Sequence, residues 1–413
     1  MSESNLDCDV LIVGGGLVGS ALALALGTLP LRVIIVESHD VRATGSAGFD
    51  ARATALANGT RHILDSLAVW PQLRPRAEAI TEIHVSERGR FGGAHFAAAE
   101  ENVAALGYTV ENRDLGAALW QVLGDSTRFE VLSPARYVDS SIEDDAIDAL
   151  IEVEGSGRRH IRTRVVVAAD GARSGVRSAL GTGASQIDYE QSAVIFNCRL
   201  QRPLAGLAVE RFMPEGPLAV LPLPDERGGV VWSLPSAGAQ RLLESDDAAV
   251  CEAFEKATGG RLGPLERIGE RALFPLYRVR SARVYGPRAV LIGSAAVNLH
   301  PVAGQGFNLA MRDVAWLAEV FADTLATQGP GADIGTVQTL QRYARQRGAD
   351  HGRVAGFTHG LVRLFGADLP GFGAVRGLGL LAFDVLPGAR RQFARHAMGR
   401  AGRSPRLACG QPL

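Results

Sequence analysis

Apolar runs and glycine-rich turns alternate along the N-terminal part of the chain. Asp9–Val13 and Arg32–Glu37 are short apolar segments typical of buried strands, and Leu17–Gly27 between them is rich in Ala and Leu, which predicts a helix. Strand, helix and strand in this order predict a parallel sheet with a right-handed crossover. The chain therefore opens with an α/β unit.

The middle of the chain has a different pattern, in which short strands follow one another. Between residues 80 and 170 the pattern predicts these elements: strands at Ile80–Arg88, Ile147–Glu154 and Arg162–Asp170, a helix at Asn112–Leu123 and a hairpin turn at Gly155–Gly157. From Gln186 to about Leu276 the sequence is mostly β, with one helix at Asp247–Ala257. Strands flanked by proline suit an antiparallel sheet with one face open to a ligand.

The α/β pattern returns near Arg288, where the apolar strand Ala289–Ile292 leads into a helix. That helix has apolar positions at Leu309, Val314, Leu317 and Phe321. We therefore expect an interrupted α/β domain that carries an inserted β-rich domain. The expected boundaries are 1–72, 110–185 and 277–350 for the first domain, 73–109 and 186–276 for the second, and 351–413 for a C-terminal helical region.

The C-terminal region is basic and amphipathic. From His351 onward, nine arginines stand against two acidic residues, Asp368 and Asp384, with leucine and phenylalanine interleaved. We favour a helical lid packed on the second domain with a solvated basic face, because such helices commonly complete a fold. The alternative is a surface that contacts a membrane or a partner protein.

Composition excludes several classes of function. The chain has 413 residues, of which 46% are hydrophobic and 21% charged, and a net charge of −1 gives no reason to expect nucleic-acid binding. Four well-separated cysteines argue against a zinc or iron–sulfur site and against a disulfide framework, so we expect a reducing, cytoplasmic compartment. The uncharged run Leu11–Leu31 is long enough to span a membrane, but its glycines and Pro30 favour strand, turn and helix.

A glycine-rich turn separates the first strand from the first helix. Gly14, Gly16 and Gly19 have the spacing G-x-G-x-x-G, and Glu37 ends the next strand. In this context the first glycine permits a tight turn, the second lets backbone amides approach a pyrophosphate, and the third lets helix and strand pack closely. The acid at Glu37 is placed to bind a ribose. The motif predicts an ADP-containing cofactor; the alternative is a tight turn without a ligand.

Two further motifs favour FAD over NAD as the resident cofactor. The strand in Val165–Arg177 ends in Asp170-Gly171, although Ser174 is also placed to cap a following helix, which would make this segment an ordinary turn. The segment Gly293–Asp313, GSAAVNLHPVAGQGFNLAMRD, places Pro301, Gly304 and Gly306 before a helix. Helix amides near Gly306 would face the pyrimidine end of a flavin and stabilise its reduced, anionic form.

Together these motifs and the segment Phe49–Thr60, FDARATALANGT, resemble those of the single-component flavoprotein aromatic hydroxylases. Within that family the chain is most similar to the ubiquinone-biosynthesis branch of 2-polyprenyl-6-methoxyphenol hydroxylases, from about Asp9 to about Arg395. The resemblance implies a Rossmann-like FAD-binding domain of the p-hydroxybenzoate-hydroxylase type, with an inserted substrate domain and C-terminal helices.

The resemblance also implies site residues. Glu37 would bind the ADP ribose, Arg52 would contact FAD from the side of the second strand, and Asp170 with Gly171 would serve FAD and transient NADPH or NADH. The implied FAD-binding residues are Gly14, Gly16, Leu17, Val18, Gly19, Glu37, Arg52, Asp170, Gly171, Ser294, Pro301, Gly304, Gly306, Phe307 and Asn308. No catalytic base can be assigned; Tyr189, Tyr277 and His300 are weak candidates, and a structural role is favoured for His300 because it precedes Pro301 in a rigid turn.

One position departs from the family pattern. The wider family usually has Gly-Asp after the strand Ala289–Ile292, with the acid on the ribityl chain, whereas this chain has Gly293-Ser294. A serine still hydrogen-bonds a hydroxyl group but lacks the charge-assisted strength of a carboxylate. We read this as weaker FAD retention rather than lost function.

The function implied is hydroxylation of a prenylated methoxyphenol with NAD(P)H and O2, through a flavin hydroperoxide, in ubiquinone biosynthesis. The expected location is cytoplasmic, with peripheral contact to the inner membrane or to a quinone-biosynthesis complex through the C-terminal region. The alternatives are a hydroxylase of another aromatic substrate, an FAD-dependent reductase or dehydrogenase, and an inactive scaffold of a quinone-biosynthesis complex.

Overall fold

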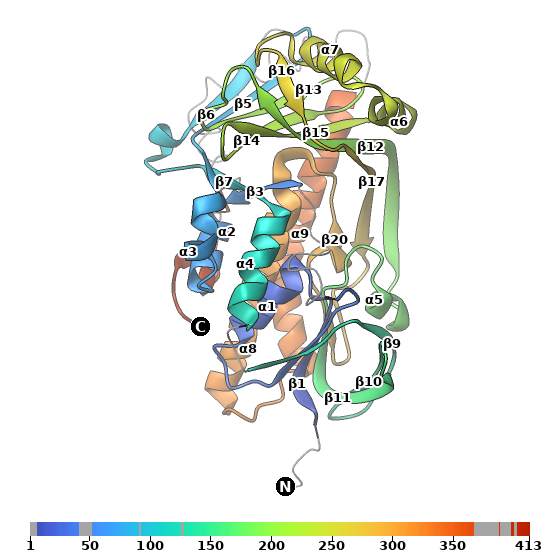
Figure 1. Cartoon of the computed structure of the whole chain (residues 1–413). Coiled ribbons are helices and arrows are strands. Elements are labelled where there is room, and N and C mark those ends of the chain that lie inside the picture. Colours follow the sequence, from blue (N-terminus) through green and yellow to red (C-terminus); the bar gives the residue numbers. More distant parts are fainter. Residues whose placement is uncertain are drawn as a thin grey trace.

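A computed structural model describes residues 6–40, 52–90, 92–124, 128–366, 388, 398–399 and 403–413. Three sheets and nine α-helices are present in these ranges. The predicted fold class, an α/β domain with a second, mostly antiparallel sheet, is confirmed. The two larger sheets lie at opposite ends of the molecule, and the long helix α9 (Val337–Gly366) extends between them (Figure 1).

The first sheet is parallel at its centre, in the order β19-β11-β1-β2-β8. Its strands are β1 Cys8–Val13, β2 Val33–Val36, β8 Phe129–Leu132, β9 Ala135–Ile142, β10 Ile147–Val153, β11 Gly157–Ala168, β18 Tyr285–Gly286 and β19 Ala289–Leu291. β9, β10 and the first half of β11 form an antiparallel extension. The predicted strand, helix and strand at the N-terminus are therefore confirmed.

Both faces of the parallel sheet are covered, which explains why β1 is buried at every position. Val10 and Ile12 face a core built with the helices α1 (Leu17–Leu26), α4 (Asn112–Gly124) and α8 (Gln305–Gln328). Leu11 and Val13 face the opposite way, onto the antiparallel extension. Alternation along the strand thus supplies two cores from one apolar run.

The second sheet is the predicted β-rich sheet. Its strands are β5 Glu82–Glu87, β6 Gly93–Ala97, β12 Ala184–Leu200, β13 Leu207–Phe212, β14 Leu218–Leu223, β15 Arg227–Pro235, β16 Leu265–Ile268, β17 Ala272–Ser281 and β20 Val297–Asn298. All pairings are antiparallel except that of β13 with β5. β12 and β17 pair along most of their length and run from this sheet toward the parallel sheet (Figure 1).

The remaining elements complete the two ends of the molecule. α6 (Ser236–Glu244) and α7 (Asp247–Thr258) pack on the outer face of the second sheet. A small sheet of β3 (Ala53–Ala57), β4 (Glu78–Ile80) and β7 (Gly107–Glu111) lies near the helices α2 (Asn58–Ser66) and α3 (Trp70–Leu73). The short helix α5 (Gly175–Ala179) follows β11.

The division into domains at the stated boundaries stays a prediction. β5 and β6, from segment 73–109, do pair in one sheet with strands of segment 186–276. Two strands, β12 and β17, extend past the expected boundaries on the side of the α/β unit. Most of the predicted C-terminal region after Gly366, including five of its nine arginines, lies outside the described residues.

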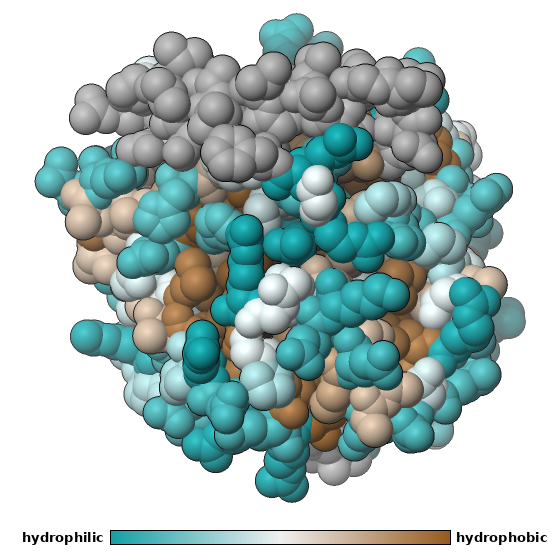
Figure 2. Space-filling model, turned by 90° about the horizontal axis from the view of Figure 1, so that it is seen from above, coloured by the Kyte–Doolittle hydropathy of each residue, from teal (hydrophilic) through white to brown (hydrophobic). Residues whose placement is uncertain are grey.

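The end of the molecule at the top of Figure 1 presents mostly polar side chains, with smaller apolar areas between them (Figure 2). Within the part of the chain that the structure describes, none of the helices has both the length and the hydropathy needed to cross a bilayer. The uncharged run at Leu11–Leu31 contains the end of β1 and all of α1 instead, which is the strand, turn and helix that its glycines and Pro30 favoured.

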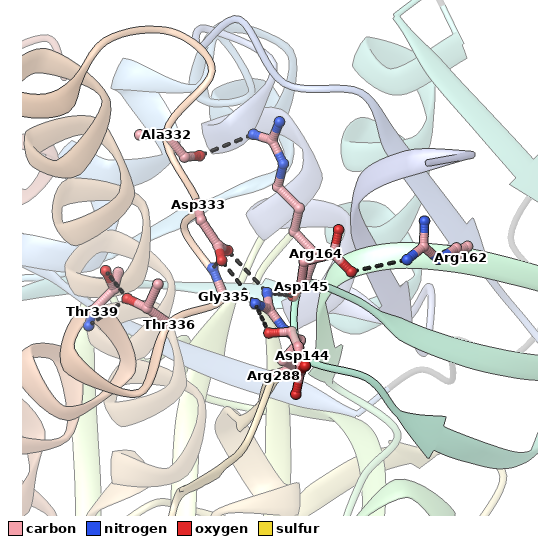
Figure 3. Close-up of polar contacts among 10 residues, drawn as sticks. All are labelled: Asp144, Asp145, Arg162, Arg164, Arg288, Ala332, Asp333, Gly335, Thr336 and Thr339. Atoms are coloured by element: carbon pink, nitrogen blue, oxygen red, sulfur yellow. Dashed lines mark hydrogen bonds and ion pairs between the residues drawn. The ribbon is translucent and has the colours of Figure 1, made fainter. Parts of the chain in front are cut away.

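A buried arginine joins three parts of the α/β unit. The guanidinium group of Arg288 donates to both carboxylate oxygens of Asp333, at 2.9 and 2.8 Å, and to the carbonyl oxygens of Asp144 and Arg164 (Figure 3). Asp333 lies between α8 and α9, Asp144 in the turn between β9 and β10, and Arg164 on β11. The planar fork of five donors in arginine allows these contacts to form at once.

We predict that Arg288→Ala lowers the free energy of unfolding by about 2–3 kcal/mol, because two carbonyl groups lose their donor and a partly buried carboxylate loses its partner. Chemical denaturation measures this loss. The exposed neighbour Arg283 is the control, and Arg283→Ala should stay within about 0.5 kcal/mol of the wild type. Equal effects of the two substitutions would show that the hydrogen bonds of Arg288 do not stabilise the fold.

Candidate functional site

Four parallel strands end at the same edge of the first sheet, and each is followed by a predicted site motif. Gly14 follows β1, Glu37 follows β2, Asp170 lies just beyond β11, and Gly293 just beyond β19. Backbone hydrogen bonds continue the sheet into these loops: the amide of Gly14 donates to Val36, at 2.8 Å. Ligands of open α/β sheets bind at this edge, beyond the carboxyl ends of the strands.

The three motif glycines have different surroundings. A β-carbon at Gly14 would lie 2.6 Å from the carbonyl oxygen of Ala169, and one at Gly19 would lie 1.8 Å from that of Gly14. At Gly16 a β-carbon would meet no atom within 4 Å. The turn is therefore closed against the sheet and open on its other side, which is the shape that a pyrophosphate cradle needs.

The start of α1 leaves its first amides available. Gly16 caps the helix without any side-chain hydrogen bond, and the first helical residues Leu17 and Val18 are only partly buried. The side chain of Val18 also reaches the second motif, 3.3 Å from where a β-carbon of Gly293 would lie. Uncapped amides at a helix start carry partial positive charge and bind anions.

Glu37 supports the glycine turn from the side. Its carboxylate accepts hydrogen bonds from the amide of Gly15, at 2.7 Å, and from the amide of His39, at 2.9 Å. Burial would raise the pKa of Glu37, but these bonds and those of the His39 and Ser38 side chains together lower it. The group is thus an anion that accepts hydrogen bonds, as a ribose-binding carboxylate must be.

Asp170 has an unsatisfied acceptor. One carboxylate oxygen accepts from the amide of Val176, at 3.3 Å, while Oδ1 is buried and has no hydrogen-bond partner in the part of the chain that the structure describes. Burial raises the pKa of Asp170, partly offset by hydrogen bonds from Ser174 and nearby amides. A β-carbon at the neighbouring Gly171 would meet nothing within 4 Å. An orphaned buried oxygen beside open space fits a bound polar ligand.

Ser174 has the capping role that the sequence also suggested. Its hydroxyl accepts from the amide of Arg177, at 3.0 Å, at the start of α5. The buried guanidinium of Arg177 then donates to the carbonyl oxygens of Ala172 and Ala295. The second residue of this pair belongs to the Gly293 loop, so Arg177 ties two site loops together.

The loop that leads into α8 begins at the predicted proline and glycines. Gly304 has a left-handed backbone, with φ 59°, and caps α8 without a side-chain hydrogen bond. Gly306 is exposed, and Pro301 and Phe307 are partly buried. The first turn of this long helix therefore begins without a side-chain cap, and its contact with a flavin stays a prediction.

The side chain of Asn308 is committed to the protein. Its oxygen accepts from Ala57 and Thr60, both at 2.7 Å, and its nitrogen donates to the carbonyl oxygens of Ala55 and Gly304. These four hydrogen bonds of the side chain join α8 to β3 and α2. Only the backbone of Asn308 is left for a cofactor.

Two other predicted residues face the second sheet or solvent. The guanidinium of Arg52, directly before β3, lies over the ring of Phe274 on β17, 4.4 Å from its centroid. Ser294, the residue that stands where the family usually has aspartate, is exposed at the parallel-strand edge. Their roles toward FAD stay predictions.

Two of the three candidate bases, His300 and Tyr189, contact each other, and their side chains already have hydrogen-bond partners. His300 is buried, accepts at Nδ1 from the amide of Val302 and contacts Gln191 through Nε2. Burial lowers the pKa of His300 to about 4, so it is neutral at physiological pH. Tyr189 packs edge-on against His300 and contacts His359 at 3.2 Å, and the carbonyl oxygen of Tyr277 accepts from Asn298. The side-chain contacts favour structural roles for His300 and Tyr189, whereas Tyr277 is held here only through its backbone and its side-chain role stays a prediction.

A buried ionic cluster that the sequence analysis missed lies under the Gly293 loop. Asp313 on α8 accepts from the amide of Gly293, at 3.0 Å, from Arg347, at 2.6 Å, and from His351, at 2.7 Å. Burial would raise the pKa of Asp313, but His351 and Arg347 outweigh it and lower the pKa to about 2. The cluster fixes the loop that carries Ser294 onto α8 and α9.

The comparisons with known proteins agree with this geometry. A family model described as an FAD binding domain matches residues 7–350. The chain belongs to this family. It is 36% identical to the ubiquinone hydroxylase UbiL of Rhodospirillum rubrum over 408 residues, which cover 98% of this chain and 93% of that protein. It is 31% identical to the 3-demethoxyubiquinol 3-hydroxylase of Escherichia coli, covering 96% of this chain and all of that protein.

Among solved structures, p-nitrophenol 4-monooxygenase PnpA from Pseudomonas putida superposes with a TM-score of 0.77. The two chains share 19% identity, and the match covers 96% of this chain and 98% of the other. At this identity the match shows the fold. The predicted family and its cofactor, FAD, are confirmed by these comparisons, whereas the roles of single residues stay proposals.

The described residues fit FAD on three independent observations. The turn at Gly16 is open where a pyrophosphate would lie, Asp170 has an unpartnered buried oxygen, and two helix starts lack side-chain caps. These features lie on one edge of the sheet, so one extended dinucleotide would satisfy all of them.

We predict that Gly16→Ala weakens FAD binding by roughly tenfold or more, while leaving the stability of the apoprotein within about 0.5 kcal/mol of the wild type. The backbone at Gly16 has φ −64°, which alanine adopts freely, and the added methyl group would meet no atom of the described residues within 4 Å, so it would intrude only on a bound pyrophosphate. Flavin fluorescence titration measures the affinity.

Gly19→Ala is the matched control. Its β-carbon would overlap the carbonyl oxygen of Gly14, so the loss should appear in the stability of the apoprotein, by about 3 kcal/mol or more. An unchanged FAD affinity in Gly16→Ala would place the pyrophosphate elsewhere.

We predict that Asp313→Asn costs about 3–5 kcal/mol of stability near pH 7, because it leaves the buried Arg347 without its partner. The lowered pKa of Asp313 means that its contribution is full above pH 3.8, its ordinary value, and is lost as the pH falls through about 2. Urea unfolding of both proteins across this range should show their difference shrinking. Asp323→Asn, on the exposed side of α8, should cost less than about 1 kcal/mol.

Proposed function

We propose that the protein is an FAD-dependent monooxygenase that hydroxylates a phenolic ring in ubiquinone biosynthesis, with O2 and NADH or NADPH as co-substrates. The observation that carries this proposal is the similarity along nearly the whole chain to a ubiquinone hydroxylase and to a 3-demethoxyubiquinol 3-hydroxylase. Bound FAD supplies the redox chemistry, taking hydride from NAD(P)H and activating O2.

The residues of the chain bind and orient the reactants. The Gly14–Gly19 turn and Glu37 would hold the ADP portion of FAD, and the amides that begin α8 would stabilise the flavin ring. The inner face of the second sheet, opposite the loop Pro301–Gly306, receives the phenol ring. Val302 of this loop packs with Phe212 of the second sheet, and the loop leads directly into α8. The arrangement would therefore position the ring against the cofactor and exclude water.

We further propose that the substrate carries a prenyl chain and a methoxy group. Apolar side chains gather where α9 approaches the second sheet, and Phe212 stacks on Phe365 with a centroid distance of 3.8 Å beside Val302. These residues offer apolar contact to a substituent of the ring. Such a substrate resides in a membrane, and the arginine-rich C-terminal sequence would allow peripheral contact with an anionic surface.

We predict that the purified holoenzyme, given NAD(P)H, labelled ¹⁸O2 and a short-chain prenylated methoxyphenol, forms a product with one labelled hydroxyl oxygen. Mass spectrometry of the extracted product measures the label. A reductase or dehydrogenase would consume NAD(P)H without incorporating label, and a scaffold would neither retain FAD nor consume NAD(P)H. Deletion in a quinone-producing host, followed by mass spectrometry of the accumulated precursor, identifies the ring position.

A further inference from the structure

One carboxyl group points from the second sheet toward the loop His300–Gly304 that precedes α8 (the flavin loop). Glu210 lies on β13, where its neighbours Val209 and Arg211 face the outer side: Val209 packs in the core with Phe254 of α7, and Arg211 approaches Gly259. Side chains alternate along a strand, so Glu210 faces the inner side with Phe212. Phe212 contacts Val302 of the flavin loop, which confirms the direction.

A backbone amide of the flavin loop holds the carboxyl group. The amide of Ala303 hydrogen-bonds to Glu210, and Ala303 itself has a left-handed backbone with φ 61° and ψ 15°. This conformation costs a residue other than glycine on the order of 1 kcal/mol, so the surrounding structure enforces it. The strained turn thereby brings an amide of the cofactor loop to a carboxyl group of the substrate sheet.

No cation compensates the charge of Glu210 among the residues that the structure describes. The charged or titratable groups on the elements around it are Glu87 on β5, His300 in the flavin loop, and His359 and Arg363 on α9; none forms an ion pair with it. Burial raises the pKa of Glu210 to about 7, partly offset by the amide of Ala303. An unpaired inward carboxyl costs stability, which favours a functional reason for its presence.

We propose that Glu210 is the catalytic base that takes the proton from the phenol hydroxyl group of the substrate. The inference rests on the proposed function, because it needs a phenol on the inner face of the second sheet. In this step the phenol O–H bond breaks, the proton forms an O–H bond with the Glu210 carboxylate, and the electron pair stays on the phenol oxygen. The ring becomes richer in electrons for oxygen transfer, and the proton later leaves to solvent.

Glu210→Gln tests this assignment, because glutamine keeps an acceptor for Ala303 but cannot take the proton. At pH 7 the hydroxylation kcat should fall by about 10²- to 10⁴-fold, the range that general bases contribute. In the wild type, activity should be lost as the pH falls through about 7, the pKa of the Glu210 carboxyl group. The variant should lack this limb and recover as alkaline pH ionises the phenol. Flavin content and the substrate dissociation constant, from flavin difference spectra, should match the wild type.

A second measurement does not depend on turnover. Since the folded-state pKa of Glu210 is raised from 4.5 to about 7, the wild type loses stability as the pH rises through this window. Glu210→Gln removes that penalty, so its thermal midpoint should rise relative to the wild type between pH 5 and pH 8. Glu244→Gln, on the exposed surface of α6, is the matched control and should change neither the pH profile nor the midpoint.

The outcomes separate the two proposals. A wild type that forms no hydroxylated product refutes the proposed function and this inference together. An active wild type with an equally active Glu210→Gln variant refutes the inference alone. A variant that fails through lost flavin or lost substrate affinity, at every pH, also overturns it, because Glu210 would then position the reactants rather than accept the proton.

Discussion

The register of four parallel strands determines where the cofactor site lies. β2, β1, β11 and β19 pair so that their carboxyl ends reach one edge of the sheet, and hydrogen bonds from Gly14, Ala169 and Ile292 extend the pairing into the loops. A slip of any strand would move its motif away from the others. The glycines, Glu37, Asp170 and Ser294 lie near one another only because this edge is shared.

The connection between cofactor site and substrate sheet depends on the start of α8. The side chain of Asn308 fastens the helix to β3 and α2, and the preceding turn directs the amide of Ala303 at Glu210 on β13. The opposite end of the same turn is held by His300 through the amide of Val302. One short loop therefore sets the distance between the flavin edge and the surface proposed to bind the phenol, and a change in it would affect both reactants.

Local patterns predicted most elements and motifs of this fold. Hydrophobic periodicity and the residues typical of turns were sufficient to predict β1, α1, β2 and the helix α8. The glycine motif was sufficient to predict that Gly16 lies on an open surface. The Asp313 cluster was missed because Arg347 and His351 lie more than thirty residues away on α9, and no pattern specifies which helix faces will meet. The sequence did contain a signal for Glu210, because this acid stands among apolar residues in the strand Leu207–Phe212. Its proximity to the turn before α8 could be recognised only from the fold, which brings Ala303 to it.

Two carboxyl groups in this molecule show how partners decide the role of a charge. Asp313 receives an arginine, a histidine and an amide, which lower its pKa and make it an anchor for the Gly293 loop. Within the described ranges Glu210 receives one amide and no cation, so burial dominates and raises its pKa. The first arrangement stabilises the folded state, whereas the second leaves a group that exchanges its proton near neutral pH. The paired carboxyl thus supports the Gly293 loop, whereas the unpaired one faces Ala303 in the turn before α8, where the proposed base is needed.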